Sequence, residues 1–188
     1  MTARLILLCH AATPATRAAR FPADELVEAG AAASLHALAA RLPQLDAAVC
    51  GRERRCGETA AGLGLDARPV AALDDWMLGG WRGRDPGEIV AGEPEGFAAW
   101  RSDPDAAPHG GESLAMLLDR VRAWLDAGPP QRRCLAVTHP AVMRAAIVHV
   151  LGAPALSFWR VDAGPLASAD LRHDGRRWVL RPGGLDGL

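Results

Sequence analysis

The strongest constraint on the fold is an unbroken apolar run at residues 5–9 that ends directly in His10. A run this short, without helical spacing, is typical of a strand buried on both faces of a sheet. Ligands of open α/β sheets bind beyond the carboxyl ends of the strands. His10 is therefore a candidate site residue, although a histidine that merely ends a strand is the simpler interpretation of this stretch alone.

The rest of the chain alternates between short apolar runs and segments of helical spacing. Strands are predicted at residues 46–50, 68–73 and 134–137, helices at 28–42, 58–65, 114–125 and 140–151, and a hairpin at 166–180. Pro69 favours a place for the 68–73 strand at a sheet margin, and Gly128-Pro129-Pro130 is expected to end the third helix. This alternation predicts an α/β protein, in which a mostly parallel sheet lies between helices. We expect one domain over residues 1–188.

Residues 73–108 are the least regular part of the predicted domain. This segment is rich in glycine and proline and also contains three tryptophans and Phe97. An aromatic segment this long favours an irregular cover over a functional site. A flexible insertion whose tryptophans bury themselves against the sheet is the alternative.

Composition narrows the class of protein. The 188 residues include 21 basic and 22 acidic side chains, with no lysine, and this balance argues against a nucleic-acid-binding protein. No apolar run is long enough to span a membrane, and the first residues lack the pattern of a signal peptide. The four cysteines show no CxxC spacing, so we expect reduced thiols and a cytoplasmic location. The sequence leaves the oligomeric state open.

The predicted topology brings basic side chains together. If the strands at 5–9, 46–50 and 134–137 are parallel, their carboxyl ends gather His10, a compact basic turn and His139 at one edge of the sheet. The turn contains Arg52, Arg54 and Arg55. Guanidinium and imidazolium groups donate hydrogen bonds to phosphoryl oxygens, and a neutral histidine can form a covalent phospho-enzyme. The pattern indicates a phosphoryl site.

Six segments, in order along the chain, resemble motifs of the histidine phosphatase superfamily (branch 1), also called phosphoglycerate mutase-like. They are residues 8–13, 20–24, 55–60, 73–83, 110–113 and 137–144. Residues 8–13 are similar to the Arg-His-Gly signature, and Gly110-Gly111-Glu112-Ser113 matches unchanged. The resemblance implies a three-layer α/β/α sandwich and a metal-independent phosphomonoester hydrolase that needs no cofactor and acts on a small phosphorylated metabolite.

The resemblance also implies roles for single residues. His10 would be phosphorylated during the reaction, and Arg55 and His139 would grip the phosphoryl oxygens. Asp75 falls at the position of the acidic proton donor, which is usually glutamate in the family. An exposed turn carboxylate is the simpler interpretation of Asp75, and Asp74 is the alternative donor.

Four further residues receive weaker assignments. Glu112 and Ser113 are expected to order a helix start and the rim of the substrate pocket, and His109 is expected to line that pocket. Arg144 is interpreted as structural, with a solvated arginine on the helix surface as the alternative.

Three departures from the motifs bear on activity. Cys9 stands where the signature has arginine, Ala11 replaces the following glycine, and Pro140-Ala141 replaces a glycine pair. Loss of one charge-stabilising donor typically lowers turnover by about 10²–10³. Another arginine could fill the gap, and the candidates are Arg17, Arg20, Arg52 and Arg54. Arg20 is the best of them, because the family often has arginine there.

Two alternatives to this hydrolase stay open. One is a catalytically weak or inactive family member that binds a phosphorylated ligand or a protein partner, and another is a phosphoglycerate-type mutase. A zinc site near His10 and His139 was also considered, with Cys9, Cys50 and Cys56 as the sulfur ligands. It is disfavoured because the ligands lack zinc-type spacing, and no metal is expected.

Overall fold

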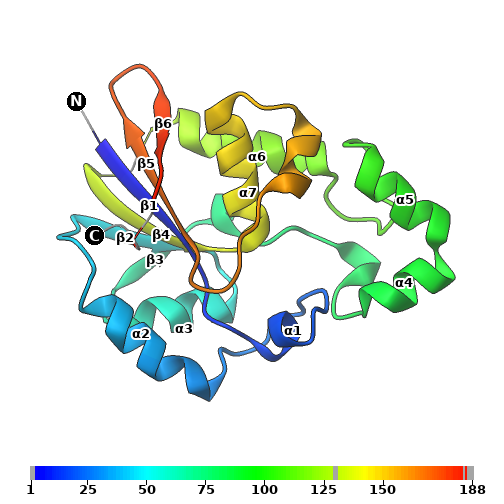
Figure 1. Cartoon of the computed structure of the whole chain (residues 1–188), viewed down its shortest axis with the longest axis horizontal. Coiled ribbons are helices and arrows are strands. Elements are labelled where there is room, and N and C mark those ends of the chain that lie inside the picture. The colour runs from blue at the N-terminus through cyan, green and yellow to red at the C-terminus, as the bar shows by residue number, and fades with distance from the viewer. Residues whose placement is uncertain (1–2, 129–130, 184, 186–188) are drawn as a thin grey trace.

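A six-stranded sheet with the order β3-β2-β4-β1-β5-β6 forms the centre of the computed structural model, which describes residues 3–128, 131–183 and 185 (Figure 1). The strands are β1 (Ala3–Cys9), β2 (Ala47–Cys50), β3 (Ala67–Pro69), β4 (Arg133–Thr138), β5 (Ser168–His173) and β6 (Trp178–Arg181). The first four are mutually parallel, and β5 and β6 run antiparallel as the predicted terminal hairpin. The mostly parallel α/β fold is confirmed, with β3 at a margin.

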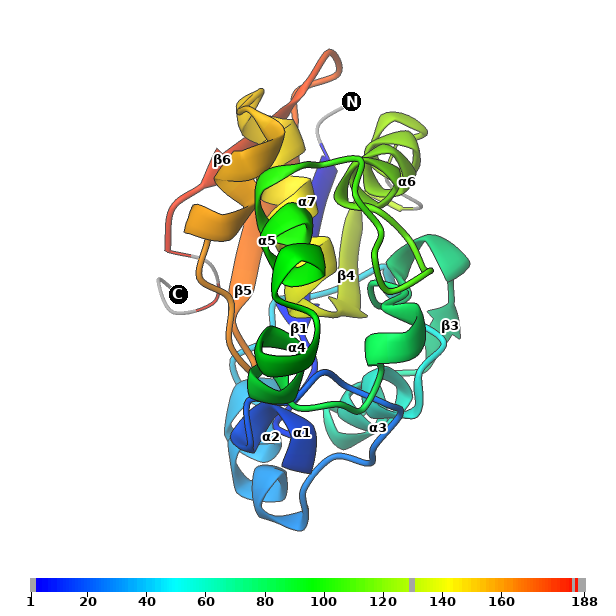
Figure 2. The same cartoon turned by 90° about the vertical axis from the view of Figure 1, so that its right-hand side faces the viewer.

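Helices cover both faces of this sheet. The α-helices are α1 (Pro14–Arg17), α2 (Ala32–Ala39), α3 (Arg54–Gly62), α4 (Pro86–Gly92), α5 (Pro94–Ser102), α6 (Leu114–Asp126) and α7 (Pro140–Leu151). Helices α2 and α3 lie on one side of the sheet and α6 and α7 on the other, while α4 and α5 extend away from it (Figures 1 and 2). The chain therefore forms the three-layer α/β/α arrangement that the motifs implied.

Strand β1 shows why its sequence is apolar without alternation. Leu5, Leu7 and Cys9 belong to the core under α6 and α7, whereas Ile6 and Leu8 belong to the core under α2 and α3. All five side chains are almost completely buried. Because successive strand residues point to opposite faces, a strand covered on both sides has no position for an exposed polar residue.

Several predicted boundaries were wrong. Helix α3 begins at Arg54 rather than residue 58, so part of the expected basic turn is helical, and α2 is shorter than residues 28–42. Helix α6 ends at Asp126 as expected, and Pro129 and Pro130 lie outside the described residues. No described helix has both the length and the apolar character required to cross a membrane.

The segment at 73–108 is more regular than predicted, since it contains α4 and α5. Pro86 and Pro94, two of the prolines of this segment, are the first residues of these helices. Proline is well tolerated there because the first backbone N–H groups of a helix have no intrahelical partner. Asp85 caps α4 by accepting a hydrogen bond from the N–H of Gly87.

Candidate active site

Two histidines meet at the carboxyl edge of the parallel strands. His10 follows β1 and His139 follows β4, and the register pairs Cys9 with Thr138, so both strands end at the same level. The ring centroids lie 5.2 Å apart, and both side chains are buried. The predicted meeting of the two histidines is confirmed.

His10 is held by one ring nitrogen. Its Nδ1 lies 2.8 Å from the carbonyl oxygen of Ala11, which can only accept, so Nδ1 carries the proton. Burial, together with the positive charges of His139 and Arg55, lowers the pKa of His10 from 6.5 to about 4. At neutral pH the ring is therefore uncharged with a lone pair on Nε2, which is the state that a nucleophile requires.

Arg55 and Asp75 form an ion pair beside these rings. Nη2 of Arg55 donates to Oδ2 of Asp75 at 2.6 Å, and the same oxygen lies 3.4 Å from Nδ1 of His139. Burial would raise the pKa of Asp75, but the positive charges of His139 and Arg55 outweigh it and hold this pKa below its usual value. One carboxylate oxygen thus lies between the guanidinium of Arg55 and the imidazole of His139.

Three nitrogen atoms of these two side chains are buried but lack hydrogen-bond partners. They are Nε and Nη1 of Arg55 and Nδ1 of His139. Both guanidinium atoms carry protons at all pH values, and Nδ1 carries one when the imidazole is protonated. Buried donors are rarely left unpaired in native structures. Arg55 and His139 therefore have buried donors that an added acceptor could satisfy.

Glu53 also contacts this site, and the sequence analysis missed it. Its Oε2 lies 2.9 Å from Nε2 of His139, and its Oε1 accepts the backbone N–H of Asp75 at 2.9 Å. Burial opposes ionisation of Glu53, but the hydrogen bond to His139 and the charge of that ring lower its pKa to about 2. Glu53 thereby fixes His139 with Nδ1 directed toward Asp75. A Cβ on Gly51 would lie only 3.0 Å from both bonded atoms, so glycine is required there.

Glu53, Cys56 and His139 are the described residues that come closest to a metal-ligand cluster. Their ligand atoms lie within 4.8 Å of one another. Nε2 of His139, however, lies 2.9 Å from Glu53 and 3.2 Å from Sγ of Cys56. Tetrahedral zinc holds such ligands roughly 3.3–3.6 Å apart, given its bond lengths of about 2.0–2.3 Å. The separations fit hydrogen bonds better than zinc ligands.

Of the two neighbouring aspartates, Asp75 is the one that faces the histidines. Asp74 instead accepts hydrogen bonds from the backbone N–H and from Nε of Arg52, at 2.9 and 2.7 Å. The Asp75 side chain is 14% exposed, so the alternative of an exposed turn carboxylate is wrong.

The Gly-Gly-Glu-Ser segment stabilises the loop that carries Asp75. Ser113 caps α6 by accepting the N–H of Met116. Glu112 pairs with Arg120, whose guanidinium also donates to the backbone carbonyl oxygens of Ala72, Asp74 and Asp75. Glu112 and Ser113 therefore order the helix start and the pocket rim. Neither lines the two cavities beside His10, Arg55 and Asp75.

The prediction that His109 lines the substrate pocket is wrong. His109 packs edge-on against Trp76, Trp81 and Trp100, and its Nδ1 accepts the N–H of Gly111. Burial lowers the pKa of His109. The turn at Gly110 and Gly111 directs the His109 ring into the tryptophan cluster. His109 lines neither of the two cavities beside His10, Arg55 and Asp75.

A cavity of about 200 Å³ adjoins His10 and Asp75. Its walls are mostly apolar and include Phe21, Trp76, Leu78, Trp100, Phe158 and Trp159. Two arginines, Arg20 and Arg144, also line it. Arg20 is the predicted phosphate ligand, and it lies 3.9 Å from Asp85 with 55% of its side chain exposed. Arg144, interpreted from the sequence as structural or solvated, is partly buried and borders this cavity. A second cavity of about 280 Å³, lined by Glu53, Arg55 and Asp75, adjoins the first.

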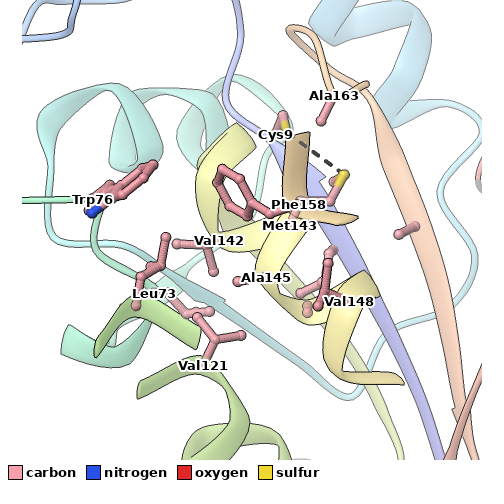
Figure 3. Close-up of a cluster of buried hydrophobic side chains, with 14 of the residues drawn as sticks. Cys9, Leu73, Trp76, Val121, Val142, Met143, Ala145, Val148, Phe158 and Ala163 are labelled. Carbon is pink, nitrogen blue, oxygen red and sulfur yellow. Dashed lines mark hydrogen bonds between the residues drawn. The ribbon is translucent and has the colours of Figure 1, made fainter. Parts of the chain in front are cut away.

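Cys9 points away from this cavity into the core below α7. Figure 3 shows its sulfur directed at Met143, and the two sulfur atoms are 3.9 Å apart. Burial raises the pKa of the Cys9 thiol to about 12, although the charge of Arg144 acts in the opposite direction. Of the other arginines considered, Arg17 pairs with Glu28, Arg52 pairs with Asp74, and Arg54 is exposed.

Known proteins are similar to this chain in both sequence and fold. A model of the histidine phosphatase superfamily (branch 1) matches residues 5–183. The adenosylcobalamin/alpha-ribazole phosphatase of Salmonella typhimurium is 31% identical over 153 residues, which are 76% of this chain and 75% of that protein. The glucosyl-3-phosphoglycerate phosphatase of Mycobacterium tuberculosis is 32% identical over 172 residues, 80% of this chain and 76% of that protein.

A solved structure extends the likeness to the whole fold. The native structure of mycobacterial glucosyl-3-phosphoglycerate phosphatase superposes with a TM-score of 0.81 at 26% identity, covering 96% of this chain and 97% of that one. The protein is thus a phosphatase, and the chain belongs to branch 1 of the histidine phosphatase superfamily.

Proposed function

We propose that the protein hydrolyses a small phosphorylated metabolite, a phosphomonoester, in two steps through a phosphohistidine on His10 and without a metal. The observation that carries this proposal is the set of unpaired buried donors on Arg55 and His139 around one oxygen of Asp75. A phosphate monoester brings a charge of about −1.5 to −2 and several acceptor oxygens. Such a group satisfies all three donors at once.

In the first step the Nε2 lone pair of His10 attacks phosphorus as the bond to the leaving oxygen breaks. Asp75 gives a proton to that oxygen, so that a neutral alcohol departs. In the second step water attacks the phosphohistidine, the P–N bond breaks, and a proton from the water returns to Asp75. Inorganic phosphate then leaves.

The Asp75 carboxyl must be protonated for this role, and substrate binding raises its pKa. In the free protein, Arg55 and His139 keep its pKa low. When these two cations turn to phosphoryl oxygens, the attraction that lowers this pKa is lost, whereas burial and the negative substrate both raise it. Substrate binding is therefore coupled to proton uptake by Asp75.

The test is turnover of p-nitrophenyl phosphate with and without EDTA, together with trapping of acid-labile phosphate on the protein. The wild type is expected to be active in EDTA and to form the adduct, and His10→Ala to lose more than about 10³-fold in turnover. No turnover by a wild type that still binds vanadate would indicate the inactive binding member instead. Transfer of phosphate between positions of a phosphoglycerate would indicate a mutase.

The other expectations are part of this proposal. Residues 1–188 act as one domain, the partner is the small substrate, and the compartment is the cytoplasm. All four cysteines are buried free thiols, which agrees with a reducing environment.

A further inference from the structure

The positive and negative charges around His10 and His139 balance each other, so these groups carry no net positive charge for binding a dianion. Arg55 pairs with Asp75 and lies 3.8 Å from Asp24, and His139 pairs with Glu53. His10 is uncharged near neutral pH, because burial holds its pKa at about 4. The positive groups are thus matched by carboxylates before any ligand arrives. A further cation in the cavity would strengthen the binding of a phosphoryl dianion.

Arg144 carries a guanidinium group and borders the same cavity as His10. It lies in the first turns of α7, five residues after His139, and it lines the same cavity as His10. Its guanidinium carbon lies 5.8 Å from the centre of the Phe158 ring. Its Nε is buried and makes no hydrogen bond to any described residue. Among the salt bridges of the described chain, none involves Arg144.

We propose that Arg144 binds the transferred phosphoryl group and supplies the charge that is absent at position 9. This inference rests on the proposed phosphatase function and adds a residue to its site. The fully buried Cys9 offers no donor to the cavity. Arg20 is less suited than Arg144, because it is more than half exposed and lies 3.9 Å from Asp85.

The position of Arg144 fits the phosphoryl group better than a remote part of the substrate. Arg144 stands on the helix that begins directly after His139, and it borders the same cavity as His10. The charge of Arg144 also acts on the buried thiol of Cys9, the residue directly before His10. A guanidinium here adds donors to those of Arg55 and His139.

The experiment compares Arg144→Met, Arg144→Lys and the control Arg122→Ala, whose arginine lies on the outer face of α6. Two quantities are measured: the affinity for vanadate or inorganic phosphate by calorimetry, and kcat/KM for p-nitrophenyl phosphate. Arg144→Met should weaken anion binding and lower kcat/KM by about 10²-fold, as expected for loss of one charge-stabilising donor. Arg144→Lys should be intermediate, added guanidinium ion should restore part of the activity of Arg144→Met, and the control should match the wild type.

A fold defect is separated from a charge defect by Cys9→Arg in the Arg144→Met background, which should recover anion affinity if the two positions serve the same oxygen atoms. Unchanged vanadate affinity and kcat/KM in Arg144→Met would overturn the proposal. A loss confined to substrates with a carboxylate, such as O-phosphoserine, would also overturn it. If the wild type shows no turnover, the proposed two-step hydrolysis through His10 fails, but a loss of vanadate binding in Arg144→Met would still support the role of Arg144.

Discussion

Replacement of Asp75 by asparagine separates its two proposed roles. In the free protein its carboxylate pairs with Arg55 at 2.6 Å, lies 3.4 Å from His139, and accepts the N–H of Trp76 at 2.8 Å. Asparagine keeps the shape and the bond to Trp76 but lacks the charge. It therefore removes both the competitor of the bound phosphate and the proton donor of the first step.

The two effects have opposite signs. A hydrogen bond to a charged group contributes about 1.5–3 kcal/mol, and a phosphate oxygen must displace this bond in the wild type. Asp75→Asn should therefore bind vanadate or phosphate roughly 10- to 100-fold more tightly, since each 1.4 kcal/mol is about tenfold in affinity. Loss of general acid catalysis should lower kcat for an alkyl phosphate by about 10²–10⁴.

The assay is calorimetric titration with vanadate plus kcat on two substrates that differ in leaving group. p-Nitrophenolate departs without a proton, so its ester should lose much less activity in Asp75→Asn than an alkyl ester does. Asp74→Asn is the matched control, because Asp74 pairs with Arg52 outside the site, and it should leave both measurements near wild type. Weaker vanadate binding in Asp75→Asn, or equal losses on the two substrates, would refute the reasoning.

Two further predictions concern pH. Because the pKa of His10 is lowered from 6.5 to about 4, the unfolded chain takes up a proton in this window that the folded chain refuses. The free energy of unfolding should fall as the pH drops from about 6.5 to about 4, and this slope should be shallower in His10→Gln when both are unfolded in urea. The pKa of Glu53 is lowered to about 2, so its stabilising effect is present above the ordinary pKa near 4.5 and is lost as the pH falls through about 2. Glu53→Gln should cost about 1–3 kcal/mol at pH 7, and a denaturation series showing the same cost near pH 2 would contradict this assignment.

The parts of the site that the sequence predicted correctly are those attached to regular strands. His10 and His139 each follow an apolar run, and parallel strands end at one edge, so their meeting follows from topology. Arg55 was found for the same reason, because α3 begins soon after β2 ends. Helix starts were less predictable, since Pro86 and Pro94 signal either a break or a first turn.

Glu53 and His109 show where sequence reasoning fails. The contact of Glu53 with His139 depends on the exact course of the turn after β2 and on the bare Cα of Gly51. No periodicity encodes such a contact between residues 86 positions apart. For His109, proximity to a matched motif suggested a pocket, but the turn at Gly110 directs its ring into the tryptophan cluster.

The alternation of side chains along β1 explains how a charge lost from that strand can be supplied again from a helix. Cys9 lies on the face of β1 that α7 covers, and His10 follows it directly after the strand ends. Met143 of α7 fills the space next to the thiol, and Arg144, one residue later, reaches the cavity beside His10. The charge of Arg144 acts on the Cys9 thiol, so an arginine at position 9 that turned from the core toward the cavity would approach the same anion. On this geometry the two positions are alternatives, so arginine at position 9 in the wild type should add little phosphate affinity, whereas the same change without Arg144 should add much. Equal gains in the two backgrounds would mean that the positions act independently.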